Sequence, residues 1–229
     1  MSLNAFLLQA DAVLRGERST ADTATPGRTV RQLVGFVLVF GGLYGAVMGS
    51  FGGVLGERFW QVVYSALKVP LLLLVTFGLN VPSFFVLFTL LGLRADFPQA
   101  MRALISAQAG LTLLLLSFAP FTLLWYASTS SYDAAVLFNA LMFALATFGA
   151  QALLRREYRP LLERDSRHRL LLRVWLFLYA FVGIQMGWLL RPFVGAPWKV
   201  TGFFRPDAWD NAYVILARTL WRLLSGQGR

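Results

Sequence analysis

The sequence contains no cysteine and a single histidine, His168. Without thiols the chain can form no disulfide, no thiolate metal site and no cysteine nucleophile. His168 stands among arginine and acidic residues, so we expect it in a polar loop. Metal-binding and thiol-dependent enzymes are thereby disfavoured. We expect no cofactor, no metal and no enzymatic activity.

Charge is scarce and of one dominant sign. Charged residues make up 14% of the chain and hydrophobic residues 57%, whereas soluble domains carry roughly 25% charged residues. Basic residues outnumber acidic ones by 21 to 11, and all of them except Lys68 and Lys199 are arginines. On a membrane protein this excess indicates orientation and contact with anionic lipids rather than nucleic-acid binding. The preference for arginine favours a bacterial origin.

Long apolar runs are what the chain has in place of charge. A helix needs about 20 residues to cross ~30 Å of hydrocarbon, and every polar backbone group at that depth must be satisfied internally. The runs are Leu33–Leu55, Val69–Leu93, Ala103–Tyr132, Ala134–Leu154 and Val174–Leu190, and none contains Asp or Glu. We therefore predict an all-α, polytopic bundle with five spans in a single membrane domain, residues 1–229, with the bundle at 33–190. The first run is too long for a signal peptide, so we expect it to be retained.

Both ends of the chain carry a polar segment with an apolar periodicity. Residues 1–32 begin with apolar side chains at helical spacing, from Leu3 to Leu14. Residues 191–229 contain a similar pattern in Ala208–Leu224, preceded by Asp207 as a helix cap. Each pattern predicts an amphipathic helix lying in the membrane interface.

The distribution of arginine and lysine predicts the orientation. Residues 1–32 hold four basic residues, residues 94–102 two and residues 155–169 six, whereas the two other connections hold one in total. Basic residues accumulate on the cytoplasmic side. Five spans in the cytoplasmic (inner) membrane, with the N-terminus inside and the C-terminus outside, fit this distribution best, although the basic tail 191–229 then lies outside. An even number of spans would place the six-arginine connection outside instead.

The first span has a glycine at every fourth position. These are Gly41, Gly45, Gly49 and Gly53. Small residues at this spacing form a groove that lets a second helix approach closely. The groove is open to three interpretations: packing inside the bundle, contact with a second copy or partner, and a substrate groove.

The second span contains the polar residues that bear on a transport path. Lys68 lies near its start, where it can extend its stem toward the interface or contact an anionic lipid or substrate. Asn80 precedes Pro82, and proline disfavours helical geometry before it. The stretch from Gln61 to Leu93 is therefore either one long kinked helix, which we favour, or a span followed by a re-entrant piece.

The end of the last span combines aromatic and basic residues. Arg191 follows Trp188 by three residues, which is close to one helical turn, so the guanidinium can stack on the indole. Trp198 and Arg205 follow in a link that contains prolines. We predict that Trp188, Arg191, Trp198 and Arg205 form one cluster at the outer interface.

The arrangement resembles the Yip1-type family of five-span membrane proteins. The resemblance covers roughly residues 30–190 and rests on the polar N-terminal segment, the glycine-rich first span and the string Lys68-Val-Pro-Leu-Leu-Leu-Leu74. It implies a non-enzymatic scaffold or accessory subunit that packs against other integral membrane proteins or a second copy. The alternative is a channel or lipid/solute transporter that uses a broken second span, with Lys68 and Asn80 as pathway contacts.

Overall fold

The computed structural model describes residue 11 and residues 26–56, 58–196, 198, 201–204 and 214. Within this part the chain is helical and has no strand. The long helices are α3 (Pro26–Gly49), α4 (Arg58–Leu90), α5 (Phe97–Ser128), α6 (Tyr132–Arg164) and α7 (Arg167–Leu190), with a 3₁₀ turn at Arg94–Asp96. All five are long and apolar enough to cross a membrane, which confirms the all-α prediction. The two predicted terminal amphipathic helices lie outside the described residues.

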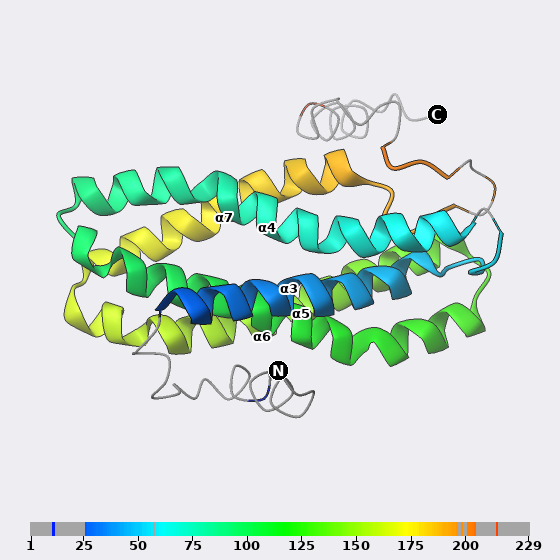
Figure 1. Cartoon of the computed structure of the whole chain (residues 1–229), viewed down its shortest axis with the longest axis horizontal. Helices are drawn as coiled ribbons and strands as arrows, with labels where there is room; N and C mark the ends of the chain where they lie inside the picture. Colours follow the sequence, from blue (N-terminus) through cyan, green and yellow to red (C-terminus); the bar gives the residue numbers. More distant parts are fainter. Residues whose placement is uncertain are drawn as a thin grey trace, which may run out of the picture.

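The helices run nearly parallel to the long axis of the molecule (Figure 1). Both α4 and α5 pack against α3, α6 packs against α5, and α7 lies mainly along α4. In contrast, α6 and α7 scarcely touch each other although only Asp165 and Ser166 separate them in the sequence. The bundle therefore has an open side between α6 and α7.

Two boundaries differ from the sequence prediction. The expected polar loop at 155–169 is almost entirely helical, because α6 continues to Arg164 and α7 begins at Arg167. Arginine and glutamate are good helix formers, so charge ends the apolar run without ending the helix. The first span ends earlier than predicted, at Gly49, and Gly53 lies in the following turn with a φ of +117°.

The second span is one continuous helix. Helix α4 has 33 residues and contains both Pro70 and Pro82, so the re-entrant alternative is wrong and the single long helix is confirmed. At 1.5 Å per residue it is about 50 Å long, more than the hydrocarbon thickness. Asn80 donates from Nδ2 to the carbonyl of Thr76 at 2.7 Å and stays inside the helix packing.

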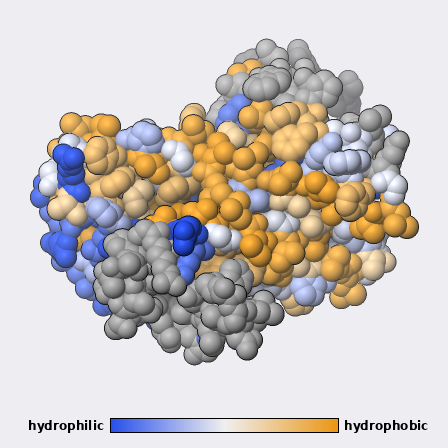
Figure 2. Space-filling model, viewed as in Figure 1, coloured by the Kyte–Doolittle hydropathy of each residue, from blue (hydrophilic) through white to orange (hydrophobic). Residues whose placement is uncertain are grey.

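The distribution of hydrophobic and hydrophilic residues on the surface follows from the apolar helices and the charged turns between them. Figure 2 shows a broad hydrophobic zone over the middle of the molecule and hydrophilic residues gathered at its left end. That end carries the α4–α5 and α6–α7 turns, with Arg94, Arg164 and Arg167. The helix lengths and this surface are those of a multi-pass membrane protein.

Candidate functional site

The glycine groove of α3 is filled by α4 of the same chain. A Cβ at Gly45 would overlap the carbonyl oxygen of Ser65, and one at Gly49 would lie 2.8 Å from the carbonyl oxygen of Gln61. Gly41 faces Pro70 of α4 and Thr112 of α5. Of the three interpretations of these glycines, packing inside the bundle is the one that the contacts support, and the groove offers no room to a partner helix.

A polar stripe of α4 begins beside its contact with α3. Arg58, Gln61, Ser65 and Lys68 follow one another at intervals of three or four residues and so share a helix face. Gln61, Ser65 and Lys68 are all buried, with Lys68 0% exposed. A lysine at this depth requires hydrogen-bond acceptors nearby.

The acceptors are successive backbone carbonyls of the segment that follows α7. Lys68 Nζ donates to the carbonyl of Pro192 at 2.9 Å, Ser65 Oγ to that of Phe193 at 2.5 Å, and Arg58 to that of Gly195 at 3.0 Å. The remaining carbonyl, that of Val194, accepts from the hydroxyl of Tyr132 at 3.2 Å.

We call residues 191–196 the return segment, because the chain here runs outward along α4 without forming a helix. Non-helical backbone at membrane depth is tolerated only where the protein satisfies it. The four hydrogen-bonded carbonyls meet this condition. The ammonium of Lys68 is buried over the return segment and lies 5.0 Å from the ring of Phe203.

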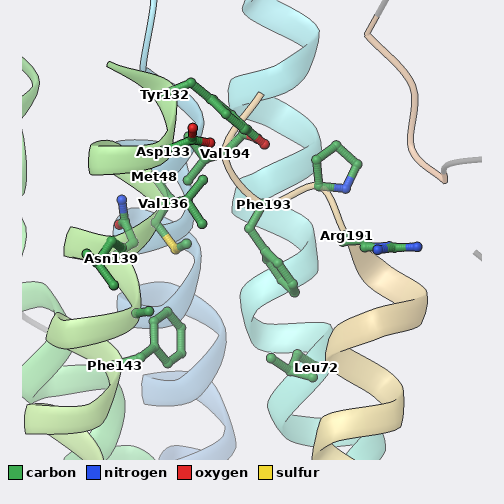
Figure 3. A pocket seen from close by; sticks show the side chains of 13 residues that line it. Met48, Leu72, Tyr132, Asp133, Val136, Asn139, Phe143, Arg191, Phe193 and Val194 are labelled. Atoms are coloured by element: carbon green, nitrogen blue, oxygen red, sulfur yellow. The ribbon is translucent and has the colours of Figure 1, made fainter. Parts of the chain in front are cut away.

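A cavity of about 640 Å³ lies between the return segment and α6. Figure 3 shows α6 on one side, the return segment and α4 on the other, and α3 behind. The lining residues are Met48, Leu72, Tyr132, Asp133, Val136, Leu137, Asn139, Ala140, Phe143 and Arg191–Val194. The cavity thus occupies the open side of the bundle, where α6 and α7 do not pack.

The cavity has a polar end and an apolar end. Tyr132 and Asp133 lie at one end, and Leu72 and Phe143 lie at the other (Figure 3). Because α6 begins at Tyr132, the polar end is near the end of the bundle and the apolar end is deeper.

Asn139, the polar residue at depth, is already satisfied by the protein. Its Nδ2 donates to the hydroxyl of Tyr126 at 2.6 Å and to the carbonyl of Ala135 at 2.7 Å, and its Oδ1 accepts from Tyr44 at 3.3 Å. Both of its donor hydrogens are therefore used internally. The deep part of the cavity suits hydrocarbon rather than a polar group.

The structure brings together part of the predicted outer cluster. The guanidinium of Arg191 lies over the indole of Trp188, 3.2 Å from the ring centroid. Trp198 instead packs edge-on against Tyr132, with the ring centroids 5.4 Å apart. Arg205 lies outside the described residues.

The opposite end of the bundle contains a contact that the sequence analysis missed. His168 lies in the first turn of α7 rather than in a polar loop and is 0% exposed. Its Nε2 is 3.1 Å from Oδ2 of Asp96, whose other oxygen accepts from Arg164. The rings of Phe88 and Tyr158 pack against the imidazole. No sequence signal connects Asp96 with His168, because they are 72 residues apart.

Two acidic side chains at this end of the bundle, Asp96 and Asp165, form ion pairs with neighbouring basic residues. Arg167 donates to both carboxylate oxygens of Asp165 and holds the pKa of that carboxyl below its usual value. Within the described ranges, no three His, Asp or Glu residues gather closely enough to hold a metal ion. The cavity is therefore the better candidate for a ligand site.

Comparison with known proteins gives no relative: no family model, curated protein or solved structure matches the chain.

Proposed function

We propose that this chain is a non-enzymatic integral membrane protein that binds the hydrocarbon tail of a membrane amphipath in the cavity between α6 and the return segment. The observation that carries the proposal is the lining of the cavity, which changes from Asp133 and Tyr132 at one end to Leu72 and Phe143 at the other. An amphipathic molecule has the same polarity gradient. The cavity volume of about 640 Å³ falls within the range of known ligand pockets, ~300–1,000 Å³.

Access from the bilayer supports this function. The cavity lies where α6 and α7 part, and its wall includes Val136 and Leu137 of α6, which are exposed on the molecular surface. Because the apolar helices place this surface in the hydrocarbon, a lipid tail can enter sideways without crossing water.

The proposed orientation places the cavity in the outer leaflet of a bacterial inner membrane. The arginine-rich turns at the other end of the bundle would face the cytoplasm, in agreement with the positive-inside rule and with contact to anionic lipids. The start of α6 and the return segment would then lie at the outer interface.

A channel through the second span has lost its structural basis. That hypothesis required a break near Asn80, whereas α4 is a continuous helix and Asn80 is bonded within it. The lipid or solute transporter of the same alternative also used the broken second span, whereas the lipid binding proposed above depends on the cavity.

A scaffold or accessory subunit is the second candidate, which the resemblance to Yip1-type proteins also implies. The glycine groove no longer supports it, but α6 presents a row of exposed apolar side chains. These are Leu137, Leu141, Leu145 and Phe148, beside the exposed small residues Ala140 and Ala144. Small residues next to larger ones are common where membrane helices associate.

Filling the cavity tests the lipid-binding proposal. Ala140 lines the cavity, and Ala144 lies one turn further along the same exposed face of α6 without lining it. We expect Ala140→Trp to abolish retention of lipid by the purified protein in mild detergent, measured by native mass spectrometry. Ala144→Trp should retain lipid as the unmodified chain does. Equal retention by the two variants would refute lipid binding in this cavity.

A further inference from the structure

We propose, on the basis of the lipid-binding function above, that the cavity selects hydrocarbon tails by their length and that Phe143 sets the limit. A tail that enters with its polar group beside Tyr132 and Asp133 meets the ring of Phe143 at the other end of the cavity. The ligand class is then a lipid with a saturated chain of medium length, such as a lauroyl or myristoyl chain.

The depth of the cavity follows from the residues of α6 that line it. The lining of this helix begins at Tyr132 and ends at Phe143, eleven residues later. At 1.5 Å per residue this depth is about 16 Å, which is close to the length of an extended myristoyl chain. An extended palmitoyl or stearoyl chain is longer than the cavity.

Side chains fill the space beyond Phe143. Figure 3 shows its ring on the cavity side of α6, at the end opposite Tyr132, with Leu72 of α4 across the gap. One turn deeper, Ala146 of α6 and Thr76 of α4 are both 0% exposed, so neither adjoins an open space. The cavity therefore does not continue inward along these two faces.

The ring of Phe143 is supported from the side of α3. It packs edge-on against the ring of Tyr44, with the two centroids 5.8 Å apart. Tyr44 is 0% exposed, and its hydroxyl donates to Oδ1 of Asn139, one turn before Phe143 on α6. Because Tyr44 is buried and hydrogen-bonded, Phe143 cannot turn toward α3 without displacing the core. A chain longer than the cavity must instead bend out toward the bilayer.

Competition between single-chain lipids of different length tests this limit. The full chain is equilibrated in mild detergent with equal amounts of two lysophosphatidylcholines, one with a myristoyl and one with a stearoyl chain, and bound lipid is counted by native mass spectrometry. We expect the myristoyl lipid to be bound about three- to tenfold more, because forcing a longer chain past a packed ring produces the strain of overpacking. The two probes have the same head group, so only the chain length differs.

Substitutions of phenylalanine on α6 assign the preference. Phe143→Ala removes the ring at the deep end and should reduce the ratio to about one, because it leaves space for the longer chain. Phe143→Leu disturbs the packing less and should give an intermediate ratio. Phe148→Ala removes an exposed ring of the same helix that does not line the cavity, and it should leave the ratio unaltered. The two probes distribute into the detergent equally for every variant, so a changed ratio reports on the protein.

The outcomes separate this inference from the function on which it rests. Equal binding of the two chain lengths by the unmodified chain, or an unaltered ratio in the Phe143 variants, would overturn the length limit while the cavity still binds lipid. If circular dichroism shows that Phe143→Ala does not fold, the ratio in Phe143→Leu decides. Equal lipid retention by Ala140→Trp and Ala144→Trp would overturn lipid binding itself.

Discussion

The ammonium of Lys68 donates a hydrogen bond to the backbone carbonyl of Pro192, 124 residues later in the chain, at 2.9 Å. This bond joins the start of the second span to the segment that follows the last one. It also supports one wall of the cavity, since Pro192 and Phe193 line it. The proposed ligand site thus depends on a buried lysine that does not itself line the cavity.

Lys68→Met should destabilise the protein and loosen the cavity. The substitution keeps the length of the side chain but leaves the Pro192 carbonyl without this donor, at a cost of about 1–3 kcal/mol. Unfolding in mixed detergent, followed by circular dichroism, measures the loss. Arg155→Met, on an exposed position of α6, is the matched control and should change stability by less than about 0.5 kcal/mol. Equal stability of the two variants would show that the Lys68 bond contributes nothing.

Asp96 and His168 should be energetically coupled. A double-mutant cycle with Asp96→Ala and His168→Ala is expected to give a coupling free energy of about 1 kcal/mol or more, because His168 is buried and the side chain of Asp96 is only 12% exposed at the joint between α7 and the turn before α5. The exposed pair Arg159 and Glu163 is the reference and should give about 0.3–0.5 kcal/mol. Additive effects at Asp96 and His168 would contradict the contact.

The pairing of Asp165 with Arg167 predicts a dependence on acidic pH. Because the folded-state pKa of Asp165 is lowered, its contribution to stability is present above the ordinary aspartate pKa of about 3.9 and is lost as the pH falls through the lowered value. Arg167→Ala should remove this contribution, so that the stability difference from the unmodified chain shrinks below about pH 4. A difference that stays constant from neutral to acidic pH would exclude a role for the ionised pair.

The lengths of the apolar runs predicted the number of helices correctly, whereas the positions of charged residues did not predict where the helices end. Five apolar runs sufficed to place five helices, and the spacing of Trp188 and Arg191 sufficed to bring that pair together, because both depend on neighbours in the sequence. The helix ends at 155–169 were misplaced, since charge marks the edge of the hydrocarbon and not the end of a helix.

The cavity could not be predicted from the sequence. It depends on α7 packing against α4 rather than α6, and on hydrogen bonds from Lys68 and Ser65 to carbonyls more than a hundred residues away. The four-residue spacing of glycines predicted a close approach between helices but could not name the helix that fills it. Long-range pairing of this kind has no local signature.

The orientation proposed for the bundle is tested by fusions of alkaline phosphatase, which is active only outside the cytoplasm. A fusion at Ser130, between α5 and α6, is expected to be active, and one at Asp165, between α6 and α7, inactive. A fusion after Arg229 should be active if the C-terminus lies outside. The reverse pattern at Ser130 and Asp165 would place the proposed lipid site in the cytoplasmic leaflet.

Two glycine-to-alanine substitutions in α3 should have opposite effects on stability. At Gly45 an added Cβ meets the backbone carbonyl of Ser65, which cannot move without displacing α4, so Gly45→Ala should cost about 1–3 kcal/mol. At Gly35 nothing lies within 4 Å of the added Cβ, so Gly35→Ala should gain up to about 1 kcal/mol from the better helix propensity of alanine. Both variants are measured by the same detergent unfolding. If Gly45→Ala stabilised the protein as much as Gly35→Ala, α4 would not fill the glycine groove, and the polar stripe from Arg58 to Lys68 would lose the packing that directs it toward the return segment.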